Sequence, residues 1–394
     1  MDHTAYLEAL KTTSNGSERS FPDAEFHQRR ERVAAAMDEA GLDALLITNP
    51  AEINYLTGYR TFEVSVHAAL VFQPGFCFLQ VPSIETGPAT ATALADAISG
   101  YRWEAIHTVV EPLCDALQGC RAIGINAWSN GLHPGLLSEL KQRLGAERLK
   151  DSAGLLDTIR LVKTDAELDR LKESARMTEA GLAAATEAIR PGVDENTIAA
   201  EGARALLAAG SEFMSLQPIV VSGPRSSVIH LNHQQRIVEE GDPVFLEFGA
   251  VRHRYTAPMM RTAVAGSPKP EMQRINDTCH QLHDALVRTM VPGNRFDDAA
   301  AAADAVLGPV ADRAFFSGVY GYSVGAQFPP SWVEGTGFIA RGVERVFRPG
   351  MVFHLPLCLR LPGQWGIGMS NTVVVGEDGA IPITHNDWKL AERP

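Results

Sequence analysis

The grouping of helices and strands after residue 158 constrains the fold of this chain more than any other feature of its sequence. A capping-box signature at Thr164 precedes a long stretch with helical apolar spacing, which predicts a helix over residues 167–189. A second helix is predicted over residues 195–209, before strand-like runs at residues 218–222 and 243–248. Because helices and strands come in blocks, the pattern indicates an α+β fold and not a doubly wound parallel sheet.

The first part of the chain follows a different pattern. An amphipathic helix begins at Asp23, and strand-like residues 68–72 and 77–81 flank a Pro74-Gly75 turn, as in a hairpin. Helical and strand segments then alternate, which predicts an α/β module of ordinary domain size. A length of 394 residues also favours two domains. We therefore expect a flexible N-terminal arm (1–20), an N-terminal α/β domain (21–158) and a second domain (159–394).

The composition narrows the possible partners. Hydrophobic residues make up 45% of the chain, enough for a large core, and the net charge of −12 with no Lys/Arg run argues against nucleic-acid binding. No apolar run is long enough to span a bilayer, and no secretory signal is recognisable. The five cysteines form no CxxC pair. These features predict a cytoplasmic protein with neither a nucleic-acid nor a membrane partner.

Residues 245–262, FLEFGAVRHRYTAPMMRT, contain the first candidate for chemistry. Glu247 lies among apolar strand residues, and burial beside a cleft would raise its pKa and make it a usable base or nucleophile. A structural ion pair between Glu247 and Arg254 or Arg261 explains the same pattern. Both interpretations remain open from the residues alone.

Several motifs resemble one known superfamily. They are SGPRSSVIHLNH at residues 222–233, GYSVG at 321–325, RPGMVF at 348–353 and NTVVVGEDG at 371–379. They resemble the pita-bread superfamily of methionine aminopeptidase, Xaa-Pro peptidases and creatinase, and INYLTGY at residues 53–59 is similar to the accessory domain of prolidase and creatinase. The resemblance implies a pita-bread C-terminal catalytic domain, an N-terminal α/β creatinase/prolidase-type domain and a homodimer.

The metal ligands of that superfamily are not where the resemblance requires them. Its peptidases bind two divalent metals through two Asp, one His and two Glu, and the matching positions here are Glu247, Pro258, Tyr322, Pro356 and, nearby, Ser370. Only Glu247 keeps a carboxylate, whereas hard divalent cations need several oxygen or nitrogen ligands at once. We therefore expect neither a metal nor another cofactor.

Among metal-free members, residues 321–332 (GYSVGAQFPPSW) are similar to the ectoine hydrolase group, with creatinase next. That resemblance implies a metal-independent hydrolase of a C–N bond in a small amidine or guanidino-type amino-acid derivative. It also implies that Glu247 is the base or nucleophile and that His230 donates the proton to the leaving nitrogen. The chain departs from the group at residues 60–70, RTFEVSVHAAL, where ectoine hydrolases have a Trp-rich stretch. The substrate therefore remains open.

The same resemblance suggests residues that surround the substrate. Tyr322 could hydrogen-bond a substrate carboxylate or only fill the space of the lost ligand. His354 is a pocket-wall candidate, and Trp332 and Trp365 could hold a cationic amidinium or pack in the core. Glu334 could pair with a cationic substrate nitrogen or be a solvated loop charge.

Further candidates are weaker. Arg254 and Tyr255 lie in the hairpin and could contact a substrate carboxylate. His233 could support His230 or lie on the surface. Phe62 and His67 could close the pocket of a neighbouring subunit, but the sequence favours a structural role for them.

Three other functions compete with the ectoine hydrolase-like one. The first is a creatinase-like amidinohydrolase, the second an Xaa-Pro dipeptidase with unusual ligands, and the third a catalytically inactive peptidase-like binding protein.

Overall fold

The structure, a computed structural model, describes residues 3–394, and the chain divides into two compact units, Met1–Ile159 and Arg160–Pro394. The division lies one residue from the boundary expected between the domains. The α+β architecture is as predicted. The first unit combines helices with one sheet, and in the second unit blocks of helices and blocks of strands alternate along the chain.

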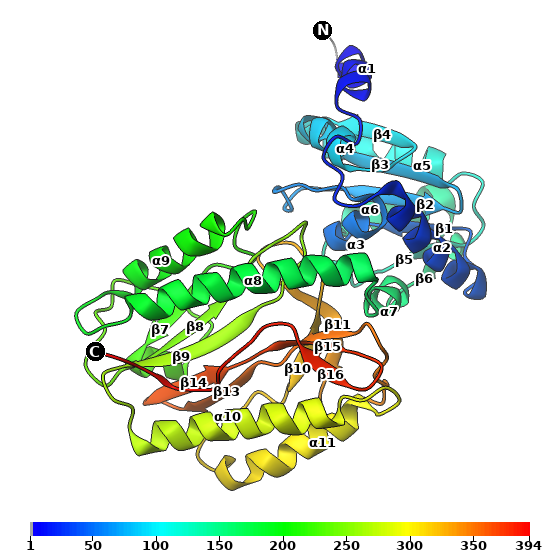
Figure 1. Cartoon of the computed structure of the whole chain (residues 1–394). Coiled ribbons are helices and arrows are strands. Elements are labelled where there is room, and N and C mark those ends of the chain that lie inside the picture. The colour runs from blue at the N-terminus through cyan, green and yellow to red at the C-terminus, as the bar shows by residue number, and fades with distance from the viewer. Residues whose placement is uncertain (1–2) are drawn as a thin grey trace. The chain divides into compact units, whose positions relative to one another are not determined.

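The first unit is built on one six-stranded sheet in the order β4-β3-β2-β1-β5-β6 (Figure 1). Its strands are β1 (Ala44–Ile47), β2 (Ala69–Gln73), β3 (Phe76–Pro82), β4 (Ala97–Tyr101), β5 (Ile123–Ile125) and β6 (Leu149–Asp151). Its helices are α1 (His3–Thr13), α2 (Asp23–Glu39), α3 (Pro50–Thr57), α4 (Thr86–Thr92), α5 (Val110–Ala116) and α6 (Pro134–Leu144), and α7 (Leu155–Arg160) crosses into the second unit. Strand β1 is buried throughout because Leu45 and Ile47 enter one core cluster while Ala44 and Leu46 enter another. The expected hairpin is present, with Gln73 opposite Phe76.

The N-terminal segment is more ordered than expected. Residues 1–20 were predicted to be a flexible arm, but residues 3–13 form α1, and residues 1–2 lie outside the described part of the chain. A Cβ built on Gly87 of α4 would lie 3.0 Å from the Tyr6 hydroxyl, so α1 lies directly against α4. The amides of Gly16 and Glu18 donate to Thr90 O and Ala91 O. These contacts were not predicted, because the segment is polar and its hydrogen bonds to α4 use backbone groups.

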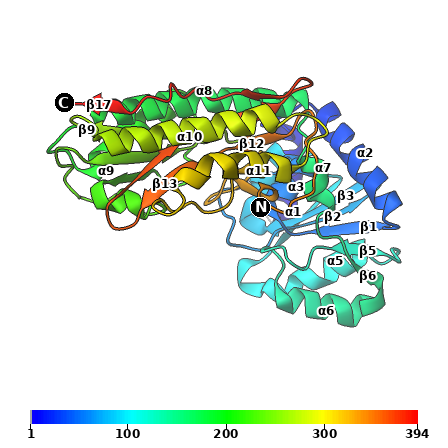
Figure 2. The ribbon, with the colours of Figure 1, turned by 90° about the horizontal axis from the view of Figure 1, so that it is seen from below.

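The second unit contains two pairs of long helices. These are α8 (Asp165–Ala188) with α9 (Glu195–Ala208), and α10 (Pro270–Thr289) with α11 (Phe296–Leu307). In Figure 1 the first pair covers one side of the strands and the second pair the other, and Figure 2 shows α10 and α11 side by side. The capping box at Thr164 is confirmed, because its hydroxyl accepts from the Glu167 amide and the Glu167 carboxylate accepts from the Thr164 amide.

The strands between these helices form three sheets. The first has the order β17-β9-β8-β7, the second β11-β10-β12-β15-β16, and the third is the hairpin β13-β14. Their bounds are β7 (Ile219–Ser222), β8 (Pro243–Phe248), β9 (Met259–Ala265), β10 (Gly321–Val324), β11 (Val333–Ile339), β12 (Val352–His354), β13 (Leu357–Leu361), β14 (Trp365–Met369), β15 (Thr372–Val375), β16 (Ala380–Pro382) and β17 (Ala391–Arg393).

The hairpin β13-β14 lies close against β8 and β9. The Thr262 hydroxyl accepts from the Gly368 amide and donates to the Gly368 carbonyl, with both distances 3.0 Å. A Cβ at Gly368 would lie 2.2 Å from the Phe245 ring, so this approach requires glycine. The contact brings residues after β12 and β14 next to Glu247 at the end of β8.

Within residues 3–394, no helix is both long and apolar enough to cross a membrane.

Candidate functional site

Glu247 lies at the floor of a cavity of about 420 Å³. It is paired across the sheet with Ile219 and Met260, and its side chain is 2% exposed. Burial raises its pKa to about 8. Within residues 3–394, Oε2 accepts no hydrogen bond and Glu247 makes no ion pair, whereas Arg261 donates to His385 O. The geometry thus favours a titrating carboxyl group over the structural ion pair.

His230 lines the same cavity and also a second one of about 400 Å³. It is exposed, and it follows Ile229 in a left-handed backbone conformation, with φ values of 42° and 45° respectively. Such conformations are costly for residues other than glycine and persist where the surroundings impose them. Tyr322 also lines both cavities, so the two hollows adjoin at these side chains.

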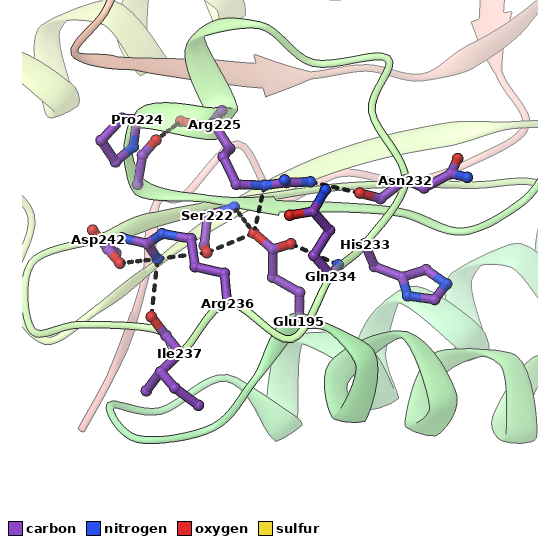
Figure 3. A network of polar contacts seen from close by, with 12 residues as sticks. Glu195, Ser222, Pro224, Arg225, Asn232, His233, Gln234, Arg236, Ile237 and Asp242 are labelled. Carbon is purple, nitrogen blue, oxygen red and sulfur yellow. Dashed lines mark hydrogen bonds and ion pairs between the residues drawn. The ribbon is translucent and has the colours of Figure 1, made fainter.

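The segment that carries His230 is anchored by the buried Glu195, the first residue of α9 (Figure 3). Its carboxylate accepts from the Ser222 amide and hydroxyl, both at 2.8 Å, and from the Gln234 amide at 3.0 Å. It also pairs with Arg225 at 3.3 Å. One buried charge therefore holds both ends of the segment that carries His230.

Tyr322 and Ser370, which lie at or near superfamily ligand positions, belong to a hydrogen-bonded chain of neutral groups. Trp332 Nε1 donates to the Tyr322 hydroxyl at 2.9 Å, and this hydroxyl lies 2.7 Å from His354 Nδ1. His354 Nε2 lies 2.7 Å from the Ser370 hydroxyl, which accepts from the Met260 amide at 2.6 Å. Burial lowers the pKa of His354 to about 3 and raises that of Tyr322, so the imidazole and the phenol are both neutral. The polar groups of these four side chains therefore find hydrogen-bond partners within the set.

These residues do not fit a pair of divalent metals. The Pro258 carbonyl accepts from the Thr372 hydroxyl at 2.7 Å, and Pro356 has no side-chain donor atom. Nowhere in residues 3–394 do three or more His, Cys, Asp or Glu side chains form a group that could hold a metal ion. Glu247 is one carboxylate where several ligands are needed at once.

Some predicted binding residues line the cavities, whereas His354 and Glu334 do not. Trp332 lines the second cavity. His354 belongs to the buried chain that supports Tyr322, while Tyr322 itself lines both cavities, and its two suggested roles both stay predictions. The Glu334 carboxylate pairs within the protein, with Lys163 at 2.6 Å and Arg160 at 3.5 Å. This buried ion pair occupies the carboxylate, contrary to both roles that the sequence suggested.

Other candidates have structural positions. Trp365 belongs to the large core cluster beneath α10, so core packing explains it. The guanidinium of Arg254 lies between the rings of Phe213 and Phe328, at 4.7 and 4.5 Å. Tyr255 is fully buried and donates to Glu167 at 2.9 Å. None of these three side chains lines either cavity.

The remaining candidates also have local roles. His233 Nδ1 lies 2.6 Å from the Asn196 side chain, which fixes the end of the His230 segment. His67 is buried in the first unit and bonds Gln80 at 3.2 Å, while Phe62 is 89% exposed. Their proposed role across a dimer stays a prediction.

Two cavity residues were missed by sequence reasoning. Cys358 and Arg360 of β13 line the cavity that contains Glu247. Neither belongs to a motif, and only the contact of β13-β14 with β8 brings them to the site. Burial raises the pKa of Cys358 to about 12, so its thiol stays protonated and is a poor nucleophile.

Comparisons with known proteins support the fold and correct the expected function. Residues 169–377 match the family model "Metallopeptidase family M24", and residues 29–162 match the "Creatinase/Prolidase N-terminal domain". The dipeptidase PepE of Mycobacterium ulcerans has a similar structure, with a TM-score of 0.82 and 25% identity over 96% of this chain and 100% of that chain. The prolidase of Pyrococcus horikoshii has a TM-score of 0.81 and 21% identity over 92% and 99%. The expected two-domain pita-bread architecture is thereby confirmed.

Curated relatives are mostly peptidases. A protein of Sinorhizobium fredii called "Uncharacterized hydrolase/peptidase y4tL" is 29% identical over 94% of this chain and 97% of its own length. The Xaa-Pro dipeptidase of Pyrococcus furiosus is 22% identical over 92% and 99%. The ectoine hydrolase of Halomonas elongata is 24% identical over 91% and 95%.

The expected non-peptide C–N hydrolase of the ectoine hydrolase type is therefore wrong as the main assignment. Ectoine hydrolase is one relative among several that are named as dipeptidases, and the similar solved structures include a dipeptidase and a prolidase. A hydrolase remains supported, and the superfamily was correctly predicted. With its model matching more than half of the sequence, the chain belongs to metallopeptidase family M24.

Proposed function

We propose that this protein hydrolyses the amide bond of short peptides of the Xaa-Pro type without using divalent metals. The observation that carries the proposal is Glu247, a buried carboxyl group with no ion pair in the described chain, in a cavity shared with His230. The names of its dipeptidase relatives suggest the substrate. The residues at the ligand positions argue for the absence of metal, since they form no donor set for cations.

The two groups have complementary tasks. The ionised Glu247 takes a proton from water while the water oxygen attacks the carbonyl carbon of the amide. His230 donates a proton to the leaving nitrogen, so the C–N bond breaks to give a carboxylic acid and an amine. Glu247 then releases its proton to solvent and His230 takes one up from solvent, which restores both groups. A base with a pKa of about 8 accepts a proton more readily than an ordinary glutamate does.

The test is release of proline from Xaa-Pro dipeptides by the purified protein, with a chelator or with added Mn²⁺. We expect turnover that the chelator leaves unchanged, and loss of turnover in Glu247→Gln and His230→Ala. Glu377→Gln, at an exposed position, is the matched control. Turnover that appears only with added metal would overturn the metal-independent mechanism.

The second candidate is a peptide-binding protein without turnover. It is favoured by the self-satisfied chain of Tyr322, His354 and Ser370, which leaves no catalytic metal to activate water. Calorimetric binding of Xaa-Pro dipeptides by wild-type protein, without proline release, would support this candidate. We further expect a homodimer and a cytoplasmic location, which rest on the sequence alone.

A further inference from the structure

The first unit contains a cavity of its own, of about 500 Å³. It is lined by residues just before β2, at the start of α5 and along α6, and Val109, Val110 and Leu136 give it an apolar wall. It shares no lining residue with the cavities of Glu247 and His230. Cavities of this size that combine apolar walls with a few polar groups commonly bind small molecules.

A buried hydrogen-bonded chain ends in this wall. The fully buried Gln80 donates from its side-chain nitrogen to Val109 O at 3.1 Å, which leaves its side-chain oxygen as an acceptor. That oxygen lies 3.2 Å from Nε2 of His67, so Nε2 carries a proton and donates it. Burial lowers the pKa of His67 to about 4, so the imidazole has a single proton near neutral pH. Nδ1 of His67 is therefore an acceptor.

This acceptor is without a partner in the part of the chain that the structure describes. His67 lines the cavity and is 3% exposed, yet its Nδ1 accepts no hydrogen bond there. A buried polar atom without a partner is destabilising, and proteins rarely keep one without a reason. A ring nitrogen held by a buried partner, with the other nitrogen bare, is also how proteins orient histidines that bind ligands.

The other lining groups define which ligand fits. Glu139 and Arg143 pair with each other at 3.4 Å, so the wall offers no unbalanced fixed charge to an ion. Among residues 3–394, no three His, Cys, Asp or Glu side chains are grouped to hold a metal. The His133 ring lies 6.0 Å from that of His67 at an angle of 52°, a separation at which aromatic rings pack. These features favour an uncharged aromatic ligand that carries a hydrogen-bond donor.

We propose that this cavity binds a small uncharged aromatic molecule whose hydroxyl group, as in a phenol, donates to His67 Nδ1. The ring of the ligand packs against the aliphatic wall and the His133 imidazole, and its hydroxyl group completes the chain that begins at Val109 O. The first unit thereby has a ligand site of its own, which goes beyond the proposed hydrolysis at Glu247 and does not depend on it.

Two probes that differ in the donor alone test the proposal. In para-fluoroanisole a methyl group replaces the hydroxyl proton of para-fluorophenol. Fluorine NMR titrations of the wild-type protein near neutral pH give both dissociation constants. We expect para-fluorophenol to bind more tightly by roughly 3- to 10-fold, as for one hydrogen bond between neutral groups. Equal affinities, or no binding of either probe, would overturn the inference.

Two variants of His67 separate the hydrogen bond from the shape of the cavity. His67→Phe keeps a ring but has no acceptor, so it should remove the preference by weakening para-fluorophenol alone. His67→Asn places an amide oxygen near the position of Nδ1 and should keep part of the preference. A His67→Phe protein that melts normally and retains the full preference would contradict the assigned hydrogen bond.

Two glycine variants test the location without altering the buried chain. A Cβ at Gly135, which lines the cavity, meets no atom within 4 Å, so Gly135→Leu has room and should weaken both probes by occupying the cavity. Gly119→Leu is the matched control, because Gly119 is exposed, has equal room and does not line the cavity. Binding that Gly135→Leu leaves unchanged would place the probes elsewhere and refute the site.

A titration with Zn²⁺ alone distinguishes the other ligand that histidines suggest. Chelator-treated wild-type protein should show no tight binding in calorimetry that His67→Phe abolishes. If it does, the cavity is a metal site and the inference fails. None of these measurements uses peptide hydrolysis, so their outcome is independent of whether the protein releases proline.

Discussion

Replacement of Glu247 by glutamine should make the protein more stable, and increasingly so as the pH rises. The pKa of Glu247 is 4.5 in an unperturbed chain and about 8 in the folded protein. Below about pH 4.5 both states hold the proton, and the residue contributes no pH dependence. Between the two values the unfolded chain releases the proton while the folded protein keeps it, so the free energy of unfolding falls.

The size of the effect follows from the same two values. Each pH unit between them lowers the free energy of unfolding by about 1.4 kcal/mol, so the loss approaches about 5 kcal/mol near pH 8 and then levels off. A neutral glutamine has no such dependence. The stability difference between Glu247→Gln and wild type should therefore grow by several kcal/mol across this range.

Urea denaturation of both proteins at a series of pH values between about 5 and 9 measures this difference. The exposed Glu377→Gln variant should run parallel to wild type throughout. A difference that stays flat, or that shrinks as the pH rises, would refute the reasoning. The flat outcome is the signature of an ionised, paired carboxylate, because pairing lowers the folded-state pKa and both states are then ionised throughout this range. The experiment thus decides between the two roles that the sequence left open for Glu247.

Three further predictions concern other parts of the second unit. Treatment with a chelator should leave the melting temperature unchanged. Metal analysis that finds two equivalents of tightly bound divalent metal in the protein would contradict this expectation. Ser370→Ala should destabilise the protein by about 1–3 kcal/mol in urea denaturation, because it leaves a buried imidazole and an amide without a partner. Ser323→Ala, whose hydroxyl is buried without a partner, should change little. Lys163→Met should cost about 3–5 kcal/mol by stranding the buried Glu334, and the double variant with Glu334→Gln should recover part of that loss.

Local sequence signals predicted the frame of the fold well. The capping box at Thr164 and the Pro74-Gly75 turn act within a few residues, so the α8 start and the β2-β3 hairpin were found directly. Residues 3–13 were missed because their attachment to α4 uses tyrosine packing and backbone hydrogen bonds, which leave no apolar run in the sequence. Sequence patterns report on residues that are close along the chain and not on contacts between segments that are distant in sequence.

The candidate site was predicted only in part for the same reason. Motif order brought Glu247, His230 and Tyr322 to attention, and the structure brings these three to one pair of cavities. Glu334 was misjudged because its partner Lys163 is distant in sequence. Cys358 and Arg360 carried no signal, since they reach the cavity only through the approach of β13-β14 to β8.

Loss of the ligand set changes what Glu247 can do. A carboxylate that coordinates a cation stays ionised, because the positive charge favours the charged form. Here the neighbouring positions carry neutral groups, so burial acts on Glu247 without opposition and raises its pKa to about 8. Its negative charge then appears only when a proton is removed near the pH at which a base is useful.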